Sequence, residues 1–545
     1  MNPELIDRLG RDLAAADYRA ETVRALLGTE ADEARQRGVF APARRSLAER
    51  ESGPLATLVR VFLFGETTDA DELGTALPAL GAAGALELGL LAASDADGSA
   101  LRAALSLNPV RIADDSRLAA PRDWWILSDL DDQLRRRPAR PYHVMGVGGA
   151  TRSLIAQLPP ADAERALDLG TGCGIVAMHL ALCGHVVATD ISERALRFAR
   201  ANARLNGIAG IEFRQGDLFE PVAGESFDLI ASNPPFVITP RGRTADGADP
   251  DAPYPAAAPI YEYRDGGKTG DELAAAVVRE APAHLAPGGT FLCLANWETP
   301  WGGNGLERVS EWIADAGDRR GALDAWVIER DRVDPARYAE TWARDGGARP
   351  GEPEFEALMR AWLDDFAARR VVAIGLGSVR IVRASEAPGT AETAVPPRSG
   401  SGRAAARGIV RTEQATGAFV PDGTLGTRLA QAFGAGVAAA RMSDAQVLET
   451  RWARADEVAE LREHRPGEES PRSIALVTSA PIERRVVADT LLAAAVGACD
   501  GDLTLAQLAD ALAIVLEVDA DAVAEALVDS ARELAWLGML APVGP

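Results

Sequence analysis

The residues best suited to chemistry lie between positions 165 and 240, where polar side chains follow predicted strands at regular intervals. Asp168 stands in the apolar strand Ala166–Leu169, directly before the turn Gly170-Thr171-Gly172-Cys173-Gly174. A ligand can approach such a turn closely, because glycine has no Cβ and tolerates positive φ. Asp190 ends the next apolar strand, where it is placed to hold a ribose diol. This spacing predicts a nucleotide-type cofactor at the carboxyl ends of the strands.

The glycine turn alone leaves the cofactor open, because nicotinamide and flavin enzymes carry similar glycines. Two further features narrow the choice. The carboxylate of Asp168 precedes the glycines, where it can face the cationic end of an amino acid rather than a pyrophosphate. Asp217 follows a third strand, and the sequence Asn233-Pro234-Pro235-Phe236 follows a fourth. Three acids and a rigid polar turn therefore recur at the same ends of the predicted strands.

With these residues in view, the stretch from about Pro141 to Val382 resembles the class I S-adenosylmethionine-dependent methyltransferases of the Asn-Pro-Pro-Phe/Tyr type. The resemblance implies S-adenosyl-L-methionine as the cofactor. In this family the glycine loop and the first acid hold the methionine part, the second acid holds the ribose, and the third holds adenine. The cofactor-binding residues carried over are Asp168, Gly170, Thr171, Gly172, Gly174, Asp190, Ile191, Asp217, Leu218 and Asn233. Family members often close the methionine end with the preceding segment, here Tyr142–Thr151.

The motif that ends in Phe236 predicts methylation of a planar nitrogen. An amide or an exocyclic base amine is a poor nucleophile, because its lone pair is delocalised. The side-chain carbonyl of Asn233 and the main-chain carbonyl after it can accept hydrogen bonds from such an NH₂ group. Pro234 and Pro235 make the turn rigid, since each proline fixes φ, and Phe236 can stack on the planar group. We therefore expect these four residues to be catalytic, acting mainly by positioning.

The substrate class is the main open question. The segment Gly266-Gly267-Lys268-Thr269-Gly270 resembles one found in the release-factor glutamine methyltransferases (the HemK/PrmC type), which favours a protein glutamine side chain. Phe236 replaces the tyrosine of that family and is also typical of enzymes that methylate guanine N2 or adenine N6. RNA or DNA base methylation is therefore the alternative. A non-catalytic scaffold and a small-molecule amine methyltransferase also remain open. Arg241, Arg243 and Arg264 can contact a substrate carboxylate or phosphate, or be solvated.

Composition bears on partners and compartment. The chain has 545 residues and a formal net charge of −23, which opposes non-specific binding to nucleic acid or anionic lipid. A protein substrate is therefore favoured over a nucleic acid. The four cysteines form no Cys-x-x-Cys pair and the five histidines do not cluster with them, so no metal site is expected. The charged N-terminus and the lack of an 18-residue apolar run predict a cytoplasmic protein without a membrane span.

Alternating apolar strands and helices predict an α/β fold with a mostly parallel sheet. The resemblance makes this a Rossmann-like, seven-stranded methyltransferase domain at residues 121–385, with a bridging segment at 121–150. Its later part is expected to hold a helix at 271–285, a strand at 289–295, and one helix at 352–369 between strands at 325–330 and 371–382. The long loop from Val237 to about Thr269 lies where a substrate lid belongs.

Two further domains are expected to flank the methyltransferase domain. Residues 1–120 and 408–545 each suggest a mainly helical, winged-helix-like domain, and a Pro- and Gly-rich linker at 386–407 precedes the second. The first contains 13 arginines and 19 acids, the second 11 arginines and 21 acids. These acidic balances favour packing or protein contact over nucleic-acid binding. The oligomeric state is not indicated.

Overall fold

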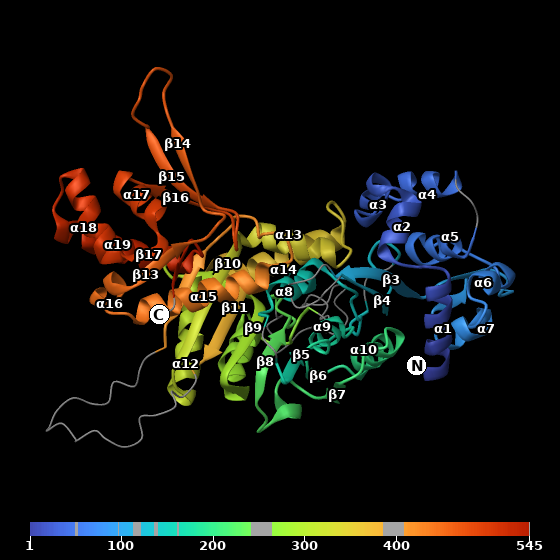
Figure 1. Cartoon of the computed structure of the whole chain (residues 1–545). Helices are drawn as coiled ribbons and strands as arrows, with labels where there is room; N and C mark the ends of the chain where they lie inside the picture. Colours follow the sequence, from blue (N-terminus) through green and yellow to red (C-terminus); the bar gives the residue numbers. More distant parts are fainter. Residues whose placement is uncertain are drawn as a thin grey trace. The chain divides into compact units, whose positions relative to one another are not determined.

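The computed structural model describes residues 1–49, 53–95, 97–112, 121–135, 140–160, 163–240, 264–384 and 408–543 (Figure 1). The chain forms two compact units. The first takes in most of the chain up to residue 408, and the second most of the chain from Ile409 onward. The predicted linker at 386–407 and most of the predicted lid, residues 241–263, lie outside the described residues. The predicted domain boundary near residue 120 stays a prediction.

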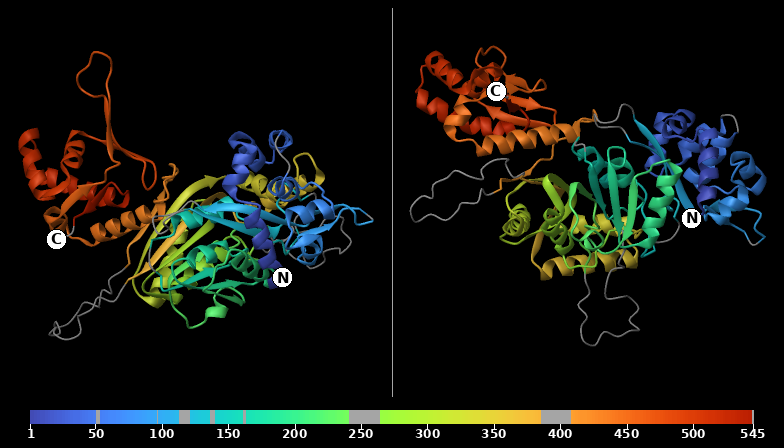
Figure 2. Two further views of the ribbon diagram at one scale, coloured as in Figure 1. Left: turned by 45° about the vertical axis from the view of Figure 1, so that its right-hand side comes forward. Right: turned by 60° about the horizontal axis from the view of Figure 1, so that its bottom comes forward.

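A long, mostly parallel sheet forms the centre of the first unit (Figures 1 and 2). The strands that this unit contributes to the sheet are β5 (Arg165–Leu169), β6 (His185–Asp190), β7 (Ile211–Gln215), β8 (Phe227–Ser232), β9 (Leu285–Pro300), β10 (Leu323–Val333) and β11 (Val371–Arg383). They lie in the order β10-β11-β9-β8-β5-β6-β7. The run from β7 to β9 is parallel, whereas β11 is antiparallel to both β9 and β10. The predicted α/β class and its final antiparallel hairpin are confirmed.

Helices cover both faces of this sheet. They are α8 (Gly149–Gln157), α9 (Ile175–Leu180), α10 (Glu193–Leu205), α11 (Glu272–Glu280) and α12 (Gly305–Arg320). Because side chains alternate along a strand, Leu167 and Leu169 point to the face that α11 and α12 cover, in a core that includes Trp297 and Trp312. The helices α9 and α10 instead contact β5, β6 and β7. This arrangement leaves the carboxyl ends of the parallel strands available for a site.

The later part of this unit differs from the sequence prediction in two ways. The helix expected at 271–285 ends at Glu280, and a 3-10 turn that contains Pro282 follows it, because proline lacks the N–H that would continue the helix. Between β10 and β11 there are two helices rather than one, α13 (Pro335–Asp345) and α14 (Pro353–Ala368). The Asp334 side chain caps α13 by accepting hydrogen bonds from two main-chain N–H groups, a start signal that the prediction overlooked.

The first 129 residues contain short helices followed by hairpins. The elements are α1 (Pro3–Ala15), α2 (Ala20–Leu27), α3 (Thr29–Gln36), α4 (Ala41–Ala48), α5 (Pro54–Leu58), a π-helical turn (Val59–Leu63), α6 (Ala70–Ala76), α7 (Gly81–Glu87), β1 (Leu91–Ala93), β2 (Leu101–Ala103), β3 (Leu105–Ile112) and β4 (Arg122–Asp129). The strands β1 and β2 pair as an antiparallel hairpin. The Asp69 side chain caps α6 by accepting a hydrogen bond from the Glu72 N–H. The winged-helix-like character of this region stays a prediction.

The strand β4 joins this region to α10, one of the helices that cover the sheet. Trp124 is buried, and Trp125 donates hydrogen bonds from its indole Nε1 to the carbonyl of Tyr18 and from its main-chain N–H to Asn206, which directly follows α10. Asn202, in α10, pairs with the main chain of Leu127 through both ends of its amide. Strand β4 is therefore tied both to α10 and to the helical region that precedes it.

The second unit contains two small antiparallel sheets and five helices among its described residues. Its elements are β12 (Val410–Gln414), α15 (Leu425–Arg441), α16 (Asp444–Glu449), β13 (Arg451–Arg454), β14 (Ala459–Glu463), β15 (Ser473–Thr478), β16 (Arg484–Ala488), α17 (Thr490–Ala498), β17 (Asp500–Thr504), α18 (Leu505–Leu516), α19 (Ala520–Trp536) and β18 (Leu540–Pro542). The sheets run β17-β13-β18 and β14-β15-β16. In the parts of both units that the structure describes, no helix has the length and apolar character required to cross a bilayer.

Candidate active site

A cavity of about 420 Å³ opens at the carboxyl ends of β5, β6 and β8 in the first unit. Its volume lies within the range of roughly 300–1,000 Å³ that is usual for small-molecule sites. In open α/β sheets ligands bind at this end of the strands, because the loops that follow neighbouring strands meet there. The cavity therefore lies where the spacing of the acids and glycines predicts a cofactor.

The glycine turn after β5 forms part of the cavity wall. Gly170 and Gly172 both have positive φ, at 77° and 55°, and both line the cavity. No atom lies within 4 Å of where a Cβ would stand on either residue, so the space in front of the turn is open to a ligand. Gly174 does not line the cavity. A Cβ there would lie 2.8 Å from the Cβ of Ala199, so Gly174 allows α9 and α10 to approach closely.

Asp168 is the most deeply buried acid of the site, with a 1% exposed side chain. It accepts a hydrogen bond of 2.6 Å from the Thr171 hydroxyl. Burial raises the pKa of this carboxyl group to about 7, against the lowering effect of the Thr171 hydrogen bond. A positive charge in the cavity would stabilise the ionised form, since an opposite charge close by favours the charged state.

Two main-chain hydrogen bonds hold Asp190, at the end of β6, in a fixed position. Asp190 Oδ2 accepts a hydrogen bond of 2.9 Å from the Gly172 N–H, and Asp190 Oδ1 accepts one of 2.9 Å from the Ser192 N–H. Ile191, directly after Asp190, lines the cavity although its side chain is 60% exposed. Asp217 and Leu218 lie beside the same space, and Leu218 has a φ of 45°, which is unusual for a residue with a side chain. This edge combines an apolar surface with carboxylates suited to a diol.

Asn233 follows β8 and presents an acceptor without a partner. Its Nδ2 donates a hydrogen bond of 3.2 Å to the hydroxyl of Thr151 in α8. Its Oδ1 is buried and has no hydrogen-bond partner among the described residues. Leaving a buried acceptor unpaired costs about 1–3 kcal/mol, so such groups in native proteins call for an explanation. Since Asn233 lines the cavity, a bound ligand with an N–H donor would supply the missing partner.

The wall beyond the Asn-Pro-Pro-Phe turn is assembled from distant parts of the chain. Phe236 forms a β-bridge with Asp265, and the Val237 N–H donates a hydrogen bond of 2.8 Å to the Arg264 carbonyl. The Arg264 guanidinium donates to the carbonyl of Trp342 at 3.0 Å and to Asp345 Oδ2 at 2.8 Å. Arg264 is 6% exposed, so the expectation that it could be solvated is wrong. Arg241 and Arg243 lie outside the described residues.

Acidic side chains dominate the charge of the cavity wall. Five aspartates line it, and Arg264 is the cationic residue among its described lining residues. The acids are Asp168, Asp190, Asp217, Asp265 and Asp345. His143 also lines the cavity, but burial lowers its pKa to about 4, so the imidazole is neutral near pH 7. A wall of this charge suits a cationic ligand and opposes a phosphate.

The structure brings nearly all of the predicted site residues to this one cavity. The predicted lining residues are Asp168, Gly170, Thr171, Gly172, Asp190, Ile191, Asp217, Leu218, Asn233, Pro234, Pro235 and Phe236. Gly174 is the exception. Several residues of the preceding segment also line the cavity, among them His143, Met145 and Thr151. Trp342 and Asp345 were not predicted, because α13 carries no motif and its contact with the site depends on the tertiary fold.

Two family models match parts of the chain. Residues 143–245 match the methyltransferase small domain, and residues 15–104 match a domain of unknown function (DUF7059). The first match runs from the segment before α8 through the glycine turn to the Asn-Pro-Pro-Phe turn. The stretch that matches the methyltransferase small domain supplies most of the cavity wall. The helices α13 and α14 lie outside both matches.

Curated relatives carry related names. A release factor glutamine methyltransferase of Xylella fastidiosa strain Temecula1 is 36% identical over 156 residues, which is 27% of this chain and 54% of that protein. A ribosomal protein uL3 glutamine methyltransferase of Bradyrhizobium diazoefficiens is 36% identical over 198 residues, 34% of this chain and 56% of that protein. The chain thus spans about half the length of the curated relatives it matches.

Solved structures align with the chain over a similar extent. One is a ribosomal protein L11 methylase of Lactobacillus delbrueckii subsp. bulgaricus, which is 18% identical, with 44% of this chain and 81% of that chain covered. The TM-score is 0.23, which is too low to support a conclusion about fold or function. The fold is therefore described from its own strand pairing.

Proposed function

We propose that the chain is an S-adenosyl-L-methionine-dependent N-methyltransferase that acts on the side-chain amide of a protein glutamine. The observation that carries this proposal is the unpaired, buried Oδ1 of Asn233 in the cavity wall. A primary amide has the N–H donor that this acceptor lacks. The names of the relatives, which specify glutamine in release factors and in ribosomal protein uL3, support the same substrate class.

The cavity fits the proposed cofactor. Asp168 would face the ammonium group of the methionine part, Asp190 the ribose hydroxyls, and Asp217 with Leu218 the adenine. The open space before Gly170 and Gly172 leaves room for a ligand against the backbone, and Ile191 offers an exposed apolar surface to a flat ring. When bound, this cofactor supplies an electrophilic methyl group on a positively charged sulfur, and the acidic wall is compatible with that charge.

The chain's own residues act by orientation rather than by strong base catalysis. In this proposal Asn233 Oδ1 and the main-chain carbonyl after it accept hydrogen bonds from the substrate NH₂, which directs the nitrogen lone pair toward the methyl group. Phe236 stacks on the planar amide, and the two prolines keep the turn rigid. Interactions that strengthen as the nitrogen gains positive charge lower the barrier selectively. The proton leaves after transfer, so no strong general base is required.

Methylation of an RNA or DNA base is the alternative reading of the same turn. Phe236 supports it, because a base can also stack there. The lining charge opposes it, since five aspartates face a single, already paired arginine among the described lining residues. A phosphate backbone at this wall would meet net negative charge. The balance therefore favours a protein substrate. A cytoplasmic location stays a prediction, as does the role of the flanking regions in packing or protein contact.

A tritium-transfer assay tests the proposal directly. Purified protein and tritiated cofactor are added to a lysate from a strain that lacks this gene, and samples are treated with ribonuclease or protease before counting. We expect label that survives ribonuclease, is lost to protease, and maps to a methylated glutamine by mass spectrometry. Label lost to ribonuclease would instead establish RNA as the substrate. An Asn233→Ala protein provides the background in every arm.

A further inference from the structure

The helices α13 and α14 are built directly onto the segment that follows the Asn-Pro-Pro-Phe turn. Val237 and Ile238 share a buried core with residues of both helices, among them Tyr338 and Trp362, and Phe236 packs against that core. These helices lie outside the two stretches that match family models. The two helices thus pack beside Phe236, on the side of the cavity proposed for the substrate amide.

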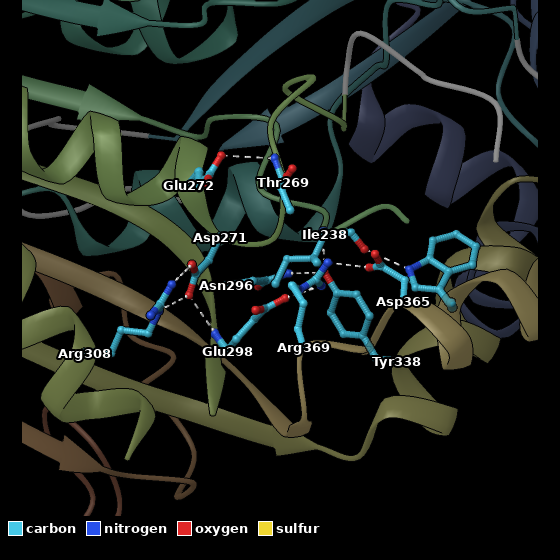
Figure 3. Close-up of polar contacts among 11 residues, drawn as sticks. Ile238, Thr269, Asp271, Glu272, Asn296, Glu298, Arg308, Tyr338, Asp365 and Arg369 are labelled. Atoms are coloured by element: carbon cyan, nitrogen blue, oxygen red, sulfur yellow. Dashed lines mark hydrogen bonds and ion pairs between the residues drawn. The ribbon is translucent and has the colours of Figure 1, made fainter. Parts of the chain in front are cut away.

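Hydrogen bonds hold both the main-chain N–H and the main-chain carbonyl of Ile238. The Ile238 N–H donates to the Tyr338 hydroxyl at 3.0 Å, and the Trp362 indole donates to the Ile238 carbonyl at 2.8 Å. Asn296 of β9 donates a further bond of 2.8 Å to the same hydroxyl (Figure 3). All of these groups are buried, so breaking any of them would leave an unpaired polar group in the core.

A second set of contacts anchors the loop that precedes α11. Asp271 accepts two hydrogen bonds from Arg308, at 2.8 and 2.7 Å, and a third from the Glu298 N–H at 2.9 Å. Arg369, which directly follows α14, donates to Glu298 and to Asp365 of α14, both at 2.6 Å (Figure 3). The loop, the end of β9 and α14 are therefore connected by charged groups, so the wall that they build is held in one arrangement.

That wall exposes an aromatic side chain and a self-neutralised ion pair to the cavity. Trp342 is half-buried and lines the cavity, and Asp345 lies one turn further along α13. The guanidinium of Arg264 pairs with Asp345 and lies 6.0 Å from the centre of the Trp342 ring. The Trp342 ring thus offers a flat apolar surface, and the ion pair beside it is neutral overall.

We propose that Trp342, with the Arg264–Asp345 pair behind it, forms a subsite for the uncharged main chain on either side of the target glutamine. The inference rests on the proposed function. Peptide groups are planar and neutral, and they can pack on an indole without meeting an unpaired charge. A charged backbone such as a phosphodiester would bring its negative charge close to Asp345. Substrate choice is thereby assigned to α13, and not only to the turn that contains Asn233.

Two substitutions of similar size test the subsite. Trp342→Ala removes the aromatic wall, whereas Trp301→Ala removes a tryptophan that is 70% exposed and does not line the cavity. Two acceptors are compared, a glutamine-centred nonapeptide and N-acetylglutamine methylamide, which is too short to extend along the wall. Binding is measured by calorimetry in the presence of S-adenosylhomocysteine, and methyl transfer is measured separately. The Trp342→Phe variant tests whether a smaller aromatic ring restores nonapeptide binding.

We expect Trp342→Ala to weaken nonapeptide binding and to raise its KM about tenfold, with kcat unchanged within about twofold. Affinity for S-adenosylhomocysteine and kcat/KM for the short amide should not change, and Trp342→Phe should recover most of the loss. Trp301→Ala should behave as wild type in each measurement. An unchanged circular dichroism spectrum and melting temperature would show that the Trp342 variants fold.

The failures of the two proposals can be told apart. If the wild-type protein methylates glutamine in the nonapeptide and Trp342→Ala does so with the same KM, the subsite is wrong and the proposed function stands. If the nonapeptide binds through Trp342 but receives no methyl group, the glutamine assignment is wrong and the polypeptide subsite stands. If the wild-type protein does not bind the nonapeptide, the subsite is wrong whatever the acceptor proves to be.

Discussion

The two halves of the cavity are built in opposite ways. The half suited to the cofactor comes from one continuous stretch, Asp168 to Leu218, in which each contributing loop follows directly after a strand. The half suited to the substrate joins Phe236 to Arg264 and Trp342, and the contact between Arg264 and Asp345 spans 81 positions of the chain. The first half can be read from local spacing, whereas the second exists only after α13 has packed. A variant should therefore affect either cofactor binding or substrate handling, but rarely both.

The largest effect expected is that of Asn233→Ala, which removes the acceptor at the boundary between the halves. Deleting one group that stabilises developing charge typically lowers kcat by about 10²–10³-fold. We expect a loss of this size in methyl transfer, together with an S-adenosylhomocysteine affinity within about threefold of wild type, because the glycine turn and the acids are unchanged. Single-turnover kinetics and calorimetry measure the two quantities.

Two outcomes for Asn233→Ala would contradict the role of Asn233 in orienting the substrate. Full methyl transfer by Asn233→Ala, with intact cofactor binding, would show that the unpaired Oδ1 does not orient the substrate. Loss of cofactor binding alone would move Asn233 into the cofactor half, in which its side chain would serve only to shape the pocket.

The charged contacts under the substrate half predict the second largest effect, on stability. Arg308→Ala would leave Asp271, whose side chain is 1% exposed, without its cationic partner. Breaking a buried pair by removing one partner typically costs about 3–5 kcal/mol, and since Arg308 itself is 40% exposed, we expect about 2–3 kcal/mol in the free energy of unfolding. Urea denaturation of the full chain measures it.

Arg279→Ala is the matched control for this prediction. Arg279 is 39% exposed, almost the same as Arg308, but its partner Asp315 is 51% exposed. Exposed pairs contribute about 0.2–1 kcal/mol, so the control should have little effect. Equal losses of unfolding free energy from the two substitutions would mean that the burial of Asp271 does not increase the contribution of its ion pair to stability.

The cofactor half of the cavity could be predicted from the sequence, whereas most of the substrate half could not. Asp190 and Asn233 could be placed from sequence, because each stands beside an apolar strand whose direction fixes where its carboxyl end lies. The sequence predicted Gly174 at the cofactor, but Gly174 precedes α9 and packs closely against Ala199 of α10 instead. The capping residue Asp334 marks the start of α13, yet nothing local shows that Trp342 faces the cavity. Such contacts depend on packing between segments far apart in the chain.

The cofactor half should also respond to pH through Asp168. Burial raises the pKa of this carboxyl group to about 7, and only its ionised form attracts the ammonium group of the cofactor. We therefore expect cofactor affinity to increase about fivefold from pH 6 to pH 7, as the ionised fraction rises. Calorimetry at constant ionic strength measures the change, and Asp168→Asn should remove the pH dependence in this range.

Without ligand, ionisation of Asp168 has the opposite consequence, because it lowers the stability of the folded protein as pH rises. Because the folded pKa lies above the ordinary value of 3.8, the contribution of Asp168 to stability is fully present below that value. It is lost as pH rises toward 7. Constant cofactor affinity across pH 6 to 7 in the wild-type protein would contradict the proposed contact between Asp168 and a cationic ligand.

The smallest effect expected concerns Thr151, which connects the segment before the glycine turn to the catalytic turn. Its hydroxyl accepts the hydrogen bond from Asn233 Nδ2 across 82 positions of sequence, and this bond holds the amide so that Oδ1 remains available to a substrate. Thr151→Val keeps the shape but removes the acceptor, and the loss of one such bond, about 0.5–1.5 kcal/mol, should lower kcat about threefold with cofactor affinity unchanged. Thr151→Ser restores the hydroxyl and should recover kcat. A merely structural role would instead lower stability and affinity in both variants alike, so steady-state kinetics on the pair decides whether Thr151 positions Asn233.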